Sequence, residues 1–350
     1  MCSARIQRDR PMPIGRRAAL LLPALAAFGA PRAQAVGPVR LGLLHTLSPA
    51  PFYLAQAHGA WAAEGVAVEF RFFDAAQPIA EAAVAGDIDL GVTGLTAGFF
   101  SLAGRGALKV IGGGLHEQKG FGLTALLVSN RAYNAGLTDL RKLPGHSFGV
   151  TQPGSSFHCM LGRLAQARGF AFNSVTVRPL QTVSNMLAAV RSGEVDSIMA
   201  VASVARPLIE AGEVKLLAWV GEAVPCQVTA LFARRAMLMP ARADVLRRFC
   251  RGYQKGVAEY RQAFLRVGSD FKPVHGPATE AAIAAIKPYV FPGDPKAAER
   301  IRDGAGWYDE GAALDVIDVV RQLDWFISQK LVKGRIDAND IIDTRFLPTR

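Results

Sequence analysis

The stretch AAVAGDID at residues 82–89 returns at residues 188–196 as AAVRSGEVD, with Gly86 and Gly193 at equivalent positions. In each copy an alanine-rich helix would stop at the glycine, an acidic turn would follow, and a buried strand would begin. A helix that ends on glycine before a strand is common in α/β proteins, so chance similarity is the alternative interpretation. Taken as a repeat, the two stretches predict two similar lobes in one chain.

Apolar runs of strand length alternate with helical periodicity around both copies. The expected strands are residues 39–44, 66–73, 90–93, 147–151, 175–177 and 197–201, and the expected helices are residues 51–57, 79–85, 156–168 and 183–191. This order predicts an α/β protein in which each lobe is a mostly parallel sheet flanked by helices. Residues 240–265 and 314–331 carry apolar side chains at helical spacing and are expected to cover a sheet.

The composition describes a folded protein with an uneven distribution of charge. The chain has 350 residues, of which 50% are hydrophobic and 20% charged, which excludes a disordered protein. Its formal net charge is +11, but residues 1–35 contribute +5 of it, and residues 234–266 hold nine basic and two acidic side chains. Basic and aromatic residues do not interleave there, so no nucleic-acid partner is expected.

The first 35 residues have the pattern of an export signal. A basic segment ends in Arg16 and Arg17, an uncharged stretch covers residues 18–30, and Ala33-Gln34-Ala35 is a small-x-small cleavage site. The stretch is short for a membrane span, so a mature periplasmic protein starting near Val36 is expected. Twin-arginine and general secretory export both remain open, and a plain basic extension is the alternative to an export signal.

Cysteine usage predicts neither a disulfide framework nor a metal site. Cys2 would leave with the leader, and Cys159, Cys226 and Cys250 allow at most one bridge, which a chain of this length does not need. The sequence has no Cys-x-x-Cys, no His-Glu-x-x-His and no Cys/His cluster. No metal and no cofactor are therefore expected.

Four segments together carry a resemblance to a known family. They are residues 43–65 (LLHTLSPAPFYLAQAHGAWAAEG), 86–94 (GDIDLGVTG), 139–154 (DLRKLPGHSFGVTQPG) and 193–212 (GEVDSIMAVASVARPLIEAG), and the tail from 325 to 347 extends the similarity. In order and spacing they resemble the periplasmic solute-binding proteins of ABC importers. The branch is the one that includes the alkanesulfonate, taurine, nitrate and thiamine-precursor binding proteins, with their thiamine-biosynthesis-like domain.

The resemblance implies a type II-like, two-lobed periplasmic binding protein with a hinge. Lobe 1 would comprise residues 36–128 and the returning part 223–350, and lobe 2 residues 129–222. A small solute, such as a sulfonate, a carboxylate or a heterocyclic compound, would be enclosed between the lobes of a monomer and passed to a membrane permease. A same-fold enzyme and a ligand-sensing partner of a membrane receptor are the alternatives.

The predicted ligand-binding residues follow the strands of both lobes, because ligands of open α/β sheets bind outside the carboxyl ends of strands. Ser155 and Ser156 begin a helix whose free amides favour an anion, although a serine there also suits a helix cap. Trp219 would supply stacking or an apolar wall. The full set is His45, Thr46, Thr93, Gly94, Leu95, Gly154, Ser155, Ser156, Val201, Ser203 and Trp219.

Other conspicuous residues are given structural roles. Phe52 is expected in the core, whereas His116 and Glu117 are expected in a solvated, glycine-rich loop. The basic segment 234–266 is either a solvated helix face or a surface that docks against a permease or lipid headgroups. No catalytic residues are assigned, because Ser156 and His158 are badly spaced for a nucleophile and its base and no Gly-x-Ser-x-Gly elbow exists.

Overall fold

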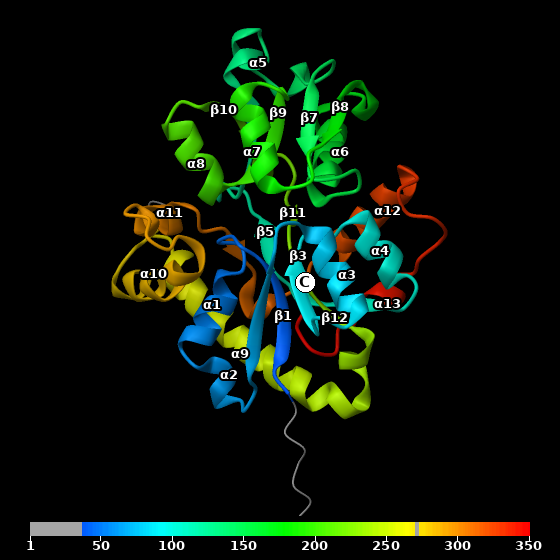
Figure 1. Cartoon of the computed structure of the whole chain (residues 1–350), viewed down its shortest axis with the longest axis vertical. Helices are drawn as coiled ribbons and strands as arrows, with labels where there is room; N and C mark the ends of the chain where they lie inside the picture. Colours follow the sequence, from blue (N-terminus) through cyan, green and yellow to red (C-terminus); the bar gives the residue numbers. More distant parts are fainter. Residues whose placement is uncertain (1–36, 270–272) are drawn as a thin grey trace, which may run out of the picture. The chain divides into compact units, whose positions relative to one another are not determined.

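The computed structural model describes residues 37–269 and 273–350, and within them two five-stranded sheets carry the fold (Figure 1). The predicted leader, residues 1–35, lies outside the described residues. The first sheet has the order β2–β1–β3–β12–β4. Its strands are β1 (Val39–Leu44), β2 (Val68–Phe73), β3 (Leu90–Thr93), β4 (Leu108–Gly113) and β12 (Ala230–Arg234).

The second sheet has the order β10–β6–β9–β7–β8. Its strands are β6 (Thr124–Ser129), β7 (Ser147–Val150), β8 (Thr176–Pro179), β9 (Ser197–Val201) and β10 (Val214–Trp219). The α/β class and the two sheet-bearing lobes predicted from the repeat are therefore confirmed. Most expected strands and helices lie within two or three residues of their predicted bounds.

Each sheet is mixed, because one strand runs against its neighbours. In the first sheet β12 pairs antiparallel with β3 and β4, and in the second β6 pairs antiparallel with β9 and β10. The physical reason is topological: β6 and β12 arrive from the other lobe and start at the edge where the parallel strands end. Because β6 already belongs to the second sheet, the chain changes lobe before Thr124, and not after Val128 as expected.

A third, three-stranded sheet occupies the crossings between the lobes. β5 (Leu115–Glu117) pairs antiparallel with β11 (Cys226–Gln227) and β13 (Trp307–Tyr308). β5 connects β4 to β6, and β11 connects β10 to β12. The prediction of a solvated loop around His116 and Glu117 is wrong. Both side chains are buried, because the pairing strands cover them.

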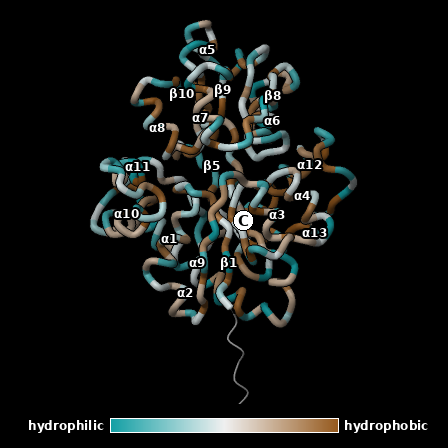
Figure 2. The backbone as a smooth tube through the Cα atoms, viewed as in Figure 1, coloured by the Kyte–Doolittle hydropathy of each residue, from teal (hydrophilic) through white to brown (hydrophobic). Residues whose placement is uncertain are grey.

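Helices pack around the sheets, and their hydropathy changes along their length, as expected of amphipathic helices (Figure 2). The longest, α9 (Pro240–Phe264), packs on α1, α2 and α10. Phe52 stacks on Tyr253 of α9 with ring centroids 4.1 Å apart, which confirms its core role. The others are α1 (Ala50–Ala57), α2 (Ala60–Ala63), α3 (Ala76–Ala85), α4 (Ala97–Ala103), α5 (Asn130–Asn134), α6 (Ser156–Arg168), α7 (Val183–Ser192), α8 (Ala202–Glu210), α10 (Pro277–Val290), α11 (Ala297–Asp303), α12 (Val316–Ser328) and α13 (Ala338–Ile341).

Several basic side chains of the segment 234–266 form ion pairs within the molecule. Arg251 and Lys255 of α9 lie 2.8 and 2.7 Å from the Glu64 carboxylate. Arg248 pairs with Asp244 one turn away. These contacts neutralise part of the helix locally, so its formal charge overstates the field that a partner would meet.

The sequence repeat is also a structural repeat. Gly86 and Gly193 end α3 and α7 in the left-handed region, with φ of 88° and 78°. The Asp89 carboxylate then accepts the Arg40 amide at 3.0 Å, and the Asp196 carboxylate accepts the amide of Ser147 at 2.9 Å. In both lobes, therefore, the acid after the glycine turn ties the third strand of the unit to its first.

The Asp89 carboxylate is expected to stabilise the fold because it is buried and also binds the guanidinium groups of Arg40 and Arg234. These hydrogen bonds outweigh its desolvation and lower the pKa of Asp89. Asp89→Asn should lower the free energy of unfolding by about 2 kcal/mol, measured by urea denaturation at pH 7, because it removes the charge that both arginines bind. The loss is not larger because the two arginines are partly exposed and water can solvate them.

The loss should shrink as the pH falls through the lowered pKa of Asp89, since protonation removes the same charge from the natural protein. Asp87→Asn is the matched control: Asp87 lies two residues away and is exposed. Equal stabilities of the two variants would contradict the role given to Asp89.

Candidate functional site

The loop after β3 touches the loop before α6, so two of the predicted groups of ligand residues meet. A Cβ on Gly94 would lie 2.6 Å from the Ser156 hydroxyl oxygen. The Ala97 amide at the start of α4 donates to the Gly154 carbonyl at 2.8 Å. Here the strand ends of the two lobes are in direct contact.

The start of α6 is organised by its own side chains. The Ser155 hydroxyl accepts the His158 amide at 3.3 Å, as a helix cap does. His158 Nδ1 in turn accepts the Gly154 amide at 2.9 Å. Burial lowers the pKa of His158 to about 4, so at neutral pH the ring is uncharged and can accept this hydrogen bond. Gly154 has a φ of 83°, which favours glycine in this turn.

The remaining residues after β3 are buried. The Thr93 hydroxyl has no hydrogen-bond partner among the described residues, whereas Leu95 packs in an apolar cluster with α3 and α4. Thr93 therefore keeps a free donor and acceptor beside the lobe contact.

His45 and Thr46 lie at the end of β1. His45 is exposed and stacks on Phe72 with ring centroids 4.5 Å apart. The Thr46 hydroxyl accepts the Ser48 amide, and its carbonyl accepts the Tyr53 hydroxyl. Both residues thus have local partners, and their role in ligand binding stays a prediction.

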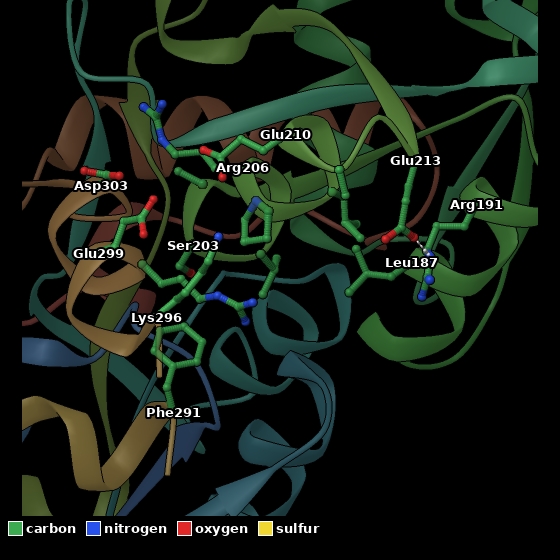
Figure 3. Close-up of a pocket in the computed structure, with 16 residues that line it drawn as sticks. Leu187, Arg191, Ser203, Arg206, Glu210, Glu213, Phe291, Lys296, Glu299 and Asp303 are labelled. Carbon is green, nitrogen blue, oxygen red and sulfur yellow. Dashed lines mark ion pairs between the residues drawn. The ribbon is translucent and has the colours of Figure 1, made fainter. Parts of the chain in front are cut away.

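Val201, Ser203 and Trp219 lie around α8, where a cavity of about 580 Å³ opens (Figure 3). Val201 is the residue before α8, Ser203 lines the cavity, and Trp219 ends β10 with its indole against Gly122. The other wall comes from Phe291 and from α11 together with the residues just before it. Ser203 packs closely on Gly304, where a Cβ would lie 2.7 Å from the serine Cβ.

The contact between α6 and α12 was not anticipated from the sequence. Arg163 of α6 pairs with Asp318 of α12 at 2.7 Å, and Asp318 also accepts the Gln227 amide of β11 at 2.8 Å. A Cβ at Gly162 would overlap the Trp325 indole. A signal was present, because Asp318 and Gln322 stand within a helix whose apolar residues recur at helical spacing, and such buried polar groups need partners.

The described residues contain no group of three or more His, Cys, Asp or Glu side chains placed to hold a metal ion. Cys159, Cys226 and Cys250 are buried and form no disulfide with one another. Within the same residues, no helix has the length and apolar character needed to cross a membrane.

The model of the family described as NMT1/THI5 like matches residues 47–263, which is more than half of the chain. The chain belongs to the NMT1/THI5-like family. None of the curated protein sequences compared with it matches significantly.

Solved structures share the fold of this NMT1/THI5-like protein at low sequence identity. The alkanesulfonate-binding protein SsuA of Xanthomonas axonopodis pv. citri, bound to MOPS, is 19% identical with a TM-score of 0.69, covering 89% of this chain and 100% of that one. The periplasmic nitrate-binding protein NrtA of Synechocystis PCC 6803 is 11% identical with a TM-score of 0.66, covering 87% and 86%.

A third neighbour names the fold. The Candida albicans CA3427 gene product, described as exhibiting the generic periplasmic binding protein fold, is 16% identical with a TM-score of 0.66 over 89% of this chain and 98% of that one. The fold class and the family branch predicted from the sequence are confirmed.

The crossing strand β5 carries an acid with unusual surroundings. Glu117 is fully buried, and neither of its carboxylate oxygens has a partner at good hydrogen-bond geometry among the described residues. Thr124 and the Gly221 amide lie near enough to favour the ionised form, but desolvation outweighs them and raises the pKa of Glu117 to about 7. The charge of this crossing strand therefore changes near neutral pH.

The contact between Gly94 and Ser156 is open to a double-mutant cycle. Gly94→Ala should lower the free energy of unfolding by about 2 kcal/mol, because the added methyl group meets both the Cβ and the hydroxyl of Ser156. Ser156→Gly removes both atoms, so Gly94→Ala should cost much less in that background. Additive losses in urea denaturation would show that the two loops are independent.

Glu117 should make stability depend on pH. Its raised pKa means that its contribution to stability is complete below the unfolded-state value near 4.5 and is lost as the pH rises through about 7. Glu117→Gln removes this loss, so its stability relative to the natural protein should rise by about 2 kcal/mol between pH 5 and pH 8.

The measurement is urea denaturation at both pH values, with Glu222→Gln as control, because Glu222 lies on the other connection between the lobes, just before β11, and is exposed. A difference between Glu117→Gln and the natural protein that stays constant with pH would contradict the raised pKa.

Proposed function

We propose that this protein captures a small organic solute between its two lobes and delivers it to the membrane permease of an ABC importer. It would work in the periplasm as a monomer, after removal of the leader predicted over residues 1–35. Membership of the NMT1/THI5-like family is the observation that carries the proposal. The fold supports it, because structural neighbours include sulfonate-binding and nitrate-binding periplasmic proteins.

The crossing strands suit reversible closure around a solute. Each lobe has its own sheet, and the short strands β5 and β11 lie on the two connections between them. A solute that contacts both lobes favours the closed arrangement by as much as it binds that arrangement better than the open one. The contacts of Gly94 with Ser156 and of Ala97 with Gly154 would form and break in this motion.

The chemistry of the site supports binding without turnover. His158 is held by the Gly154 amide, so it is not available to activate a serine. Burial raises the pKa of the Cys159 and Cys250 thiols to about 12, which leaves them protonated and poorly nucleophilic. We therefore propose that the bound solute leaves unchanged.

The decisive experiment is a melting-shift screen of the purified full chain with sulfonates, carboxylates, nitrate and pyrimidines. A true solute should stabilise the protein by about 2.7 kcal/mol at a hundredfold excess over its dissociation constant. Product formation from that solute would favour the enzyme alternative.

Uptake of the labelled solute by cells lacking the gene then separates transport from sensing. Loss of uptake supports the importer, whereas normal uptake with a lost cellular response supports a receptor partner. The absence of any binding solute would contradict the proposed function.

A further inference from the structure

The cavity beside α8 contains a cation without a counter-ion. Arg206 lines it, and no ion pair of Arg206 is found in the described part of the chain. Its Nε is buried without a hydrogen-bond partner. The other two arginines of the cavity are neutralised, Arg191 by Glu213 and Arg300 by Asp294. A partly buried guanidinium with an unpaired donor is costly unless an acceptor reaches it.

Arg206 is held so that its donors stay available. Its guanidinium lies over the Trp219 indole, 4.8 Å from the ring centroid. Stacking uses the face of the guanidinium and leaves the Nη groups at its edge, which are not buried as Nε is, free for hydrogen bonds to an oxyanion. Trp219 therefore fixes the position of the arginine and does not neutralise it.

A second donor lies one helical turn from Arg206. Ser203 and Arg206 are three residues apart on α8, so their side chains share a face, and both line the cavity. Ser203 is only 4% exposed, and its hydroxyl makes no hydrogen bond within residues 37–269 and 273–350. The serine hydroxyl and the guanidinium are together suited to an oxyanion.

The acids of the cavity do not replace that anion. Glu210, Glu299 and Asp303 are exposed, so water screens their charges. Figure 3 draws the ion pair between Arg191 and Glu213 as a dashed line, and this pair lies well away from Glu299 and Asp303. The partly buried Arg206 is therefore the group of the cavity that most needs a counter-ion.

The size and walls of the cavity select an organic molecule. Its volume of about 580 Å³ lies within the roughly 300–1,000 Å³ of small-molecule sites and far exceeds the needs of an inorganic ion. Leu187 and Pro207 supply apolar surface from one lobe, and Phe291 supplies it from the other.

We propose that this cavity is the solute site, and that it binds an alkyl or aryl carboxylate or sulfonate whose oxyanion is held by Arg206 and Ser203. The inference rests on the proposed function and deepens it by naming the solute class and the residue that selects it. It also moves the site from the contact between Gly94 and Ser156 to the cavity between α8 and α11.

The first test needs no mutation. Calorimetry of the full chain with benzoate, phenylacetate, hexanoate, benzenesulfonate and hexanesulfonate should find a binder, and the two headgroups show which oxyanion is preferred. Benzamide matches benzoate in shape but is neutral, and benzylamine is cationic. The anion should bind at least tenfold more tightly than its neutral analogue, and failure of every oxyanion overturns the inference.

The second test assigns the residue. Arg206→Gln should weaken the best oxyanion at least tenfold, and Arg206→Lys should lose less because it keeps the charge but not the planar fork. Arg141→Gln is the control, because Arg141 is not among the residues that line the cavity and is exposed and paired with Asp139, so the affinity of this variant should stay within about twofold. Circular dichroism and urea denaturation of each variant confirm that it is folded.

The outcomes separate this inference from the proposed function. If a pyrimidine or another neutral solute binds and Arg206→Gln leaves its affinity unchanged, the protein is still a solute-binding protein and the inference is wrong. If no solute of any class binds, and mass spectrometry finds none released from the denatured protein, the proposed function fails and the inference fails with it.

Discussion

The structure depends on a carboxylate that joins two strands of each lobe. Asp89 and Asp196 each follow a left-handed glycine turn and accept a backbone amide from the first strand of their unit. These bonds set where a strand lies beside its neighbour, and hence where it ends. Because the loops that carry Gly94 and Ser156 follow β3 and β7, the place where these loops meet follows from this repeated interaction.

The crossings between the lobes impose the second constraint. A strand that enters from the other lobe must start where the parallel strands end, so β6 and β12 run against their neighbours. The same crossings bury Glu117 beside Cys226, where water cannot solvate its charge. In this connection between the lobes, burial therefore raises the pKa of the Glu117 carboxyl group to about 7.

Two contacts between the lobes differ in character. At Gly94 the Ser156 side chain approaches so closely that the protein itself fills the space. Around α8 the lobes touch at Ser203 and Gly304 but leave a cavity lined by Arg206, which has no ion pair in the part of the chain that the structure describes. Proteins leave a buried donor unpaired at a cost, so such a group is informative about function in a way that a satisfied helix cap such as Ser155 is not.

The sequence by itself determined the α/β class, the repeat and the family branch, because glycine turns, strand periodicity and segment order are local properties. It also placed Thr93, Gly154 and Ser203 at strand ends or helix starts. Only the tertiary structure decided that Gly94 touches Ser156, that Arg163 meets Asp318, and that Arg206 has no counter-ion among the described residues. Those facts depend on residues far apart in the chain, and burial and charge pairing are set only when the sheets and helices pack.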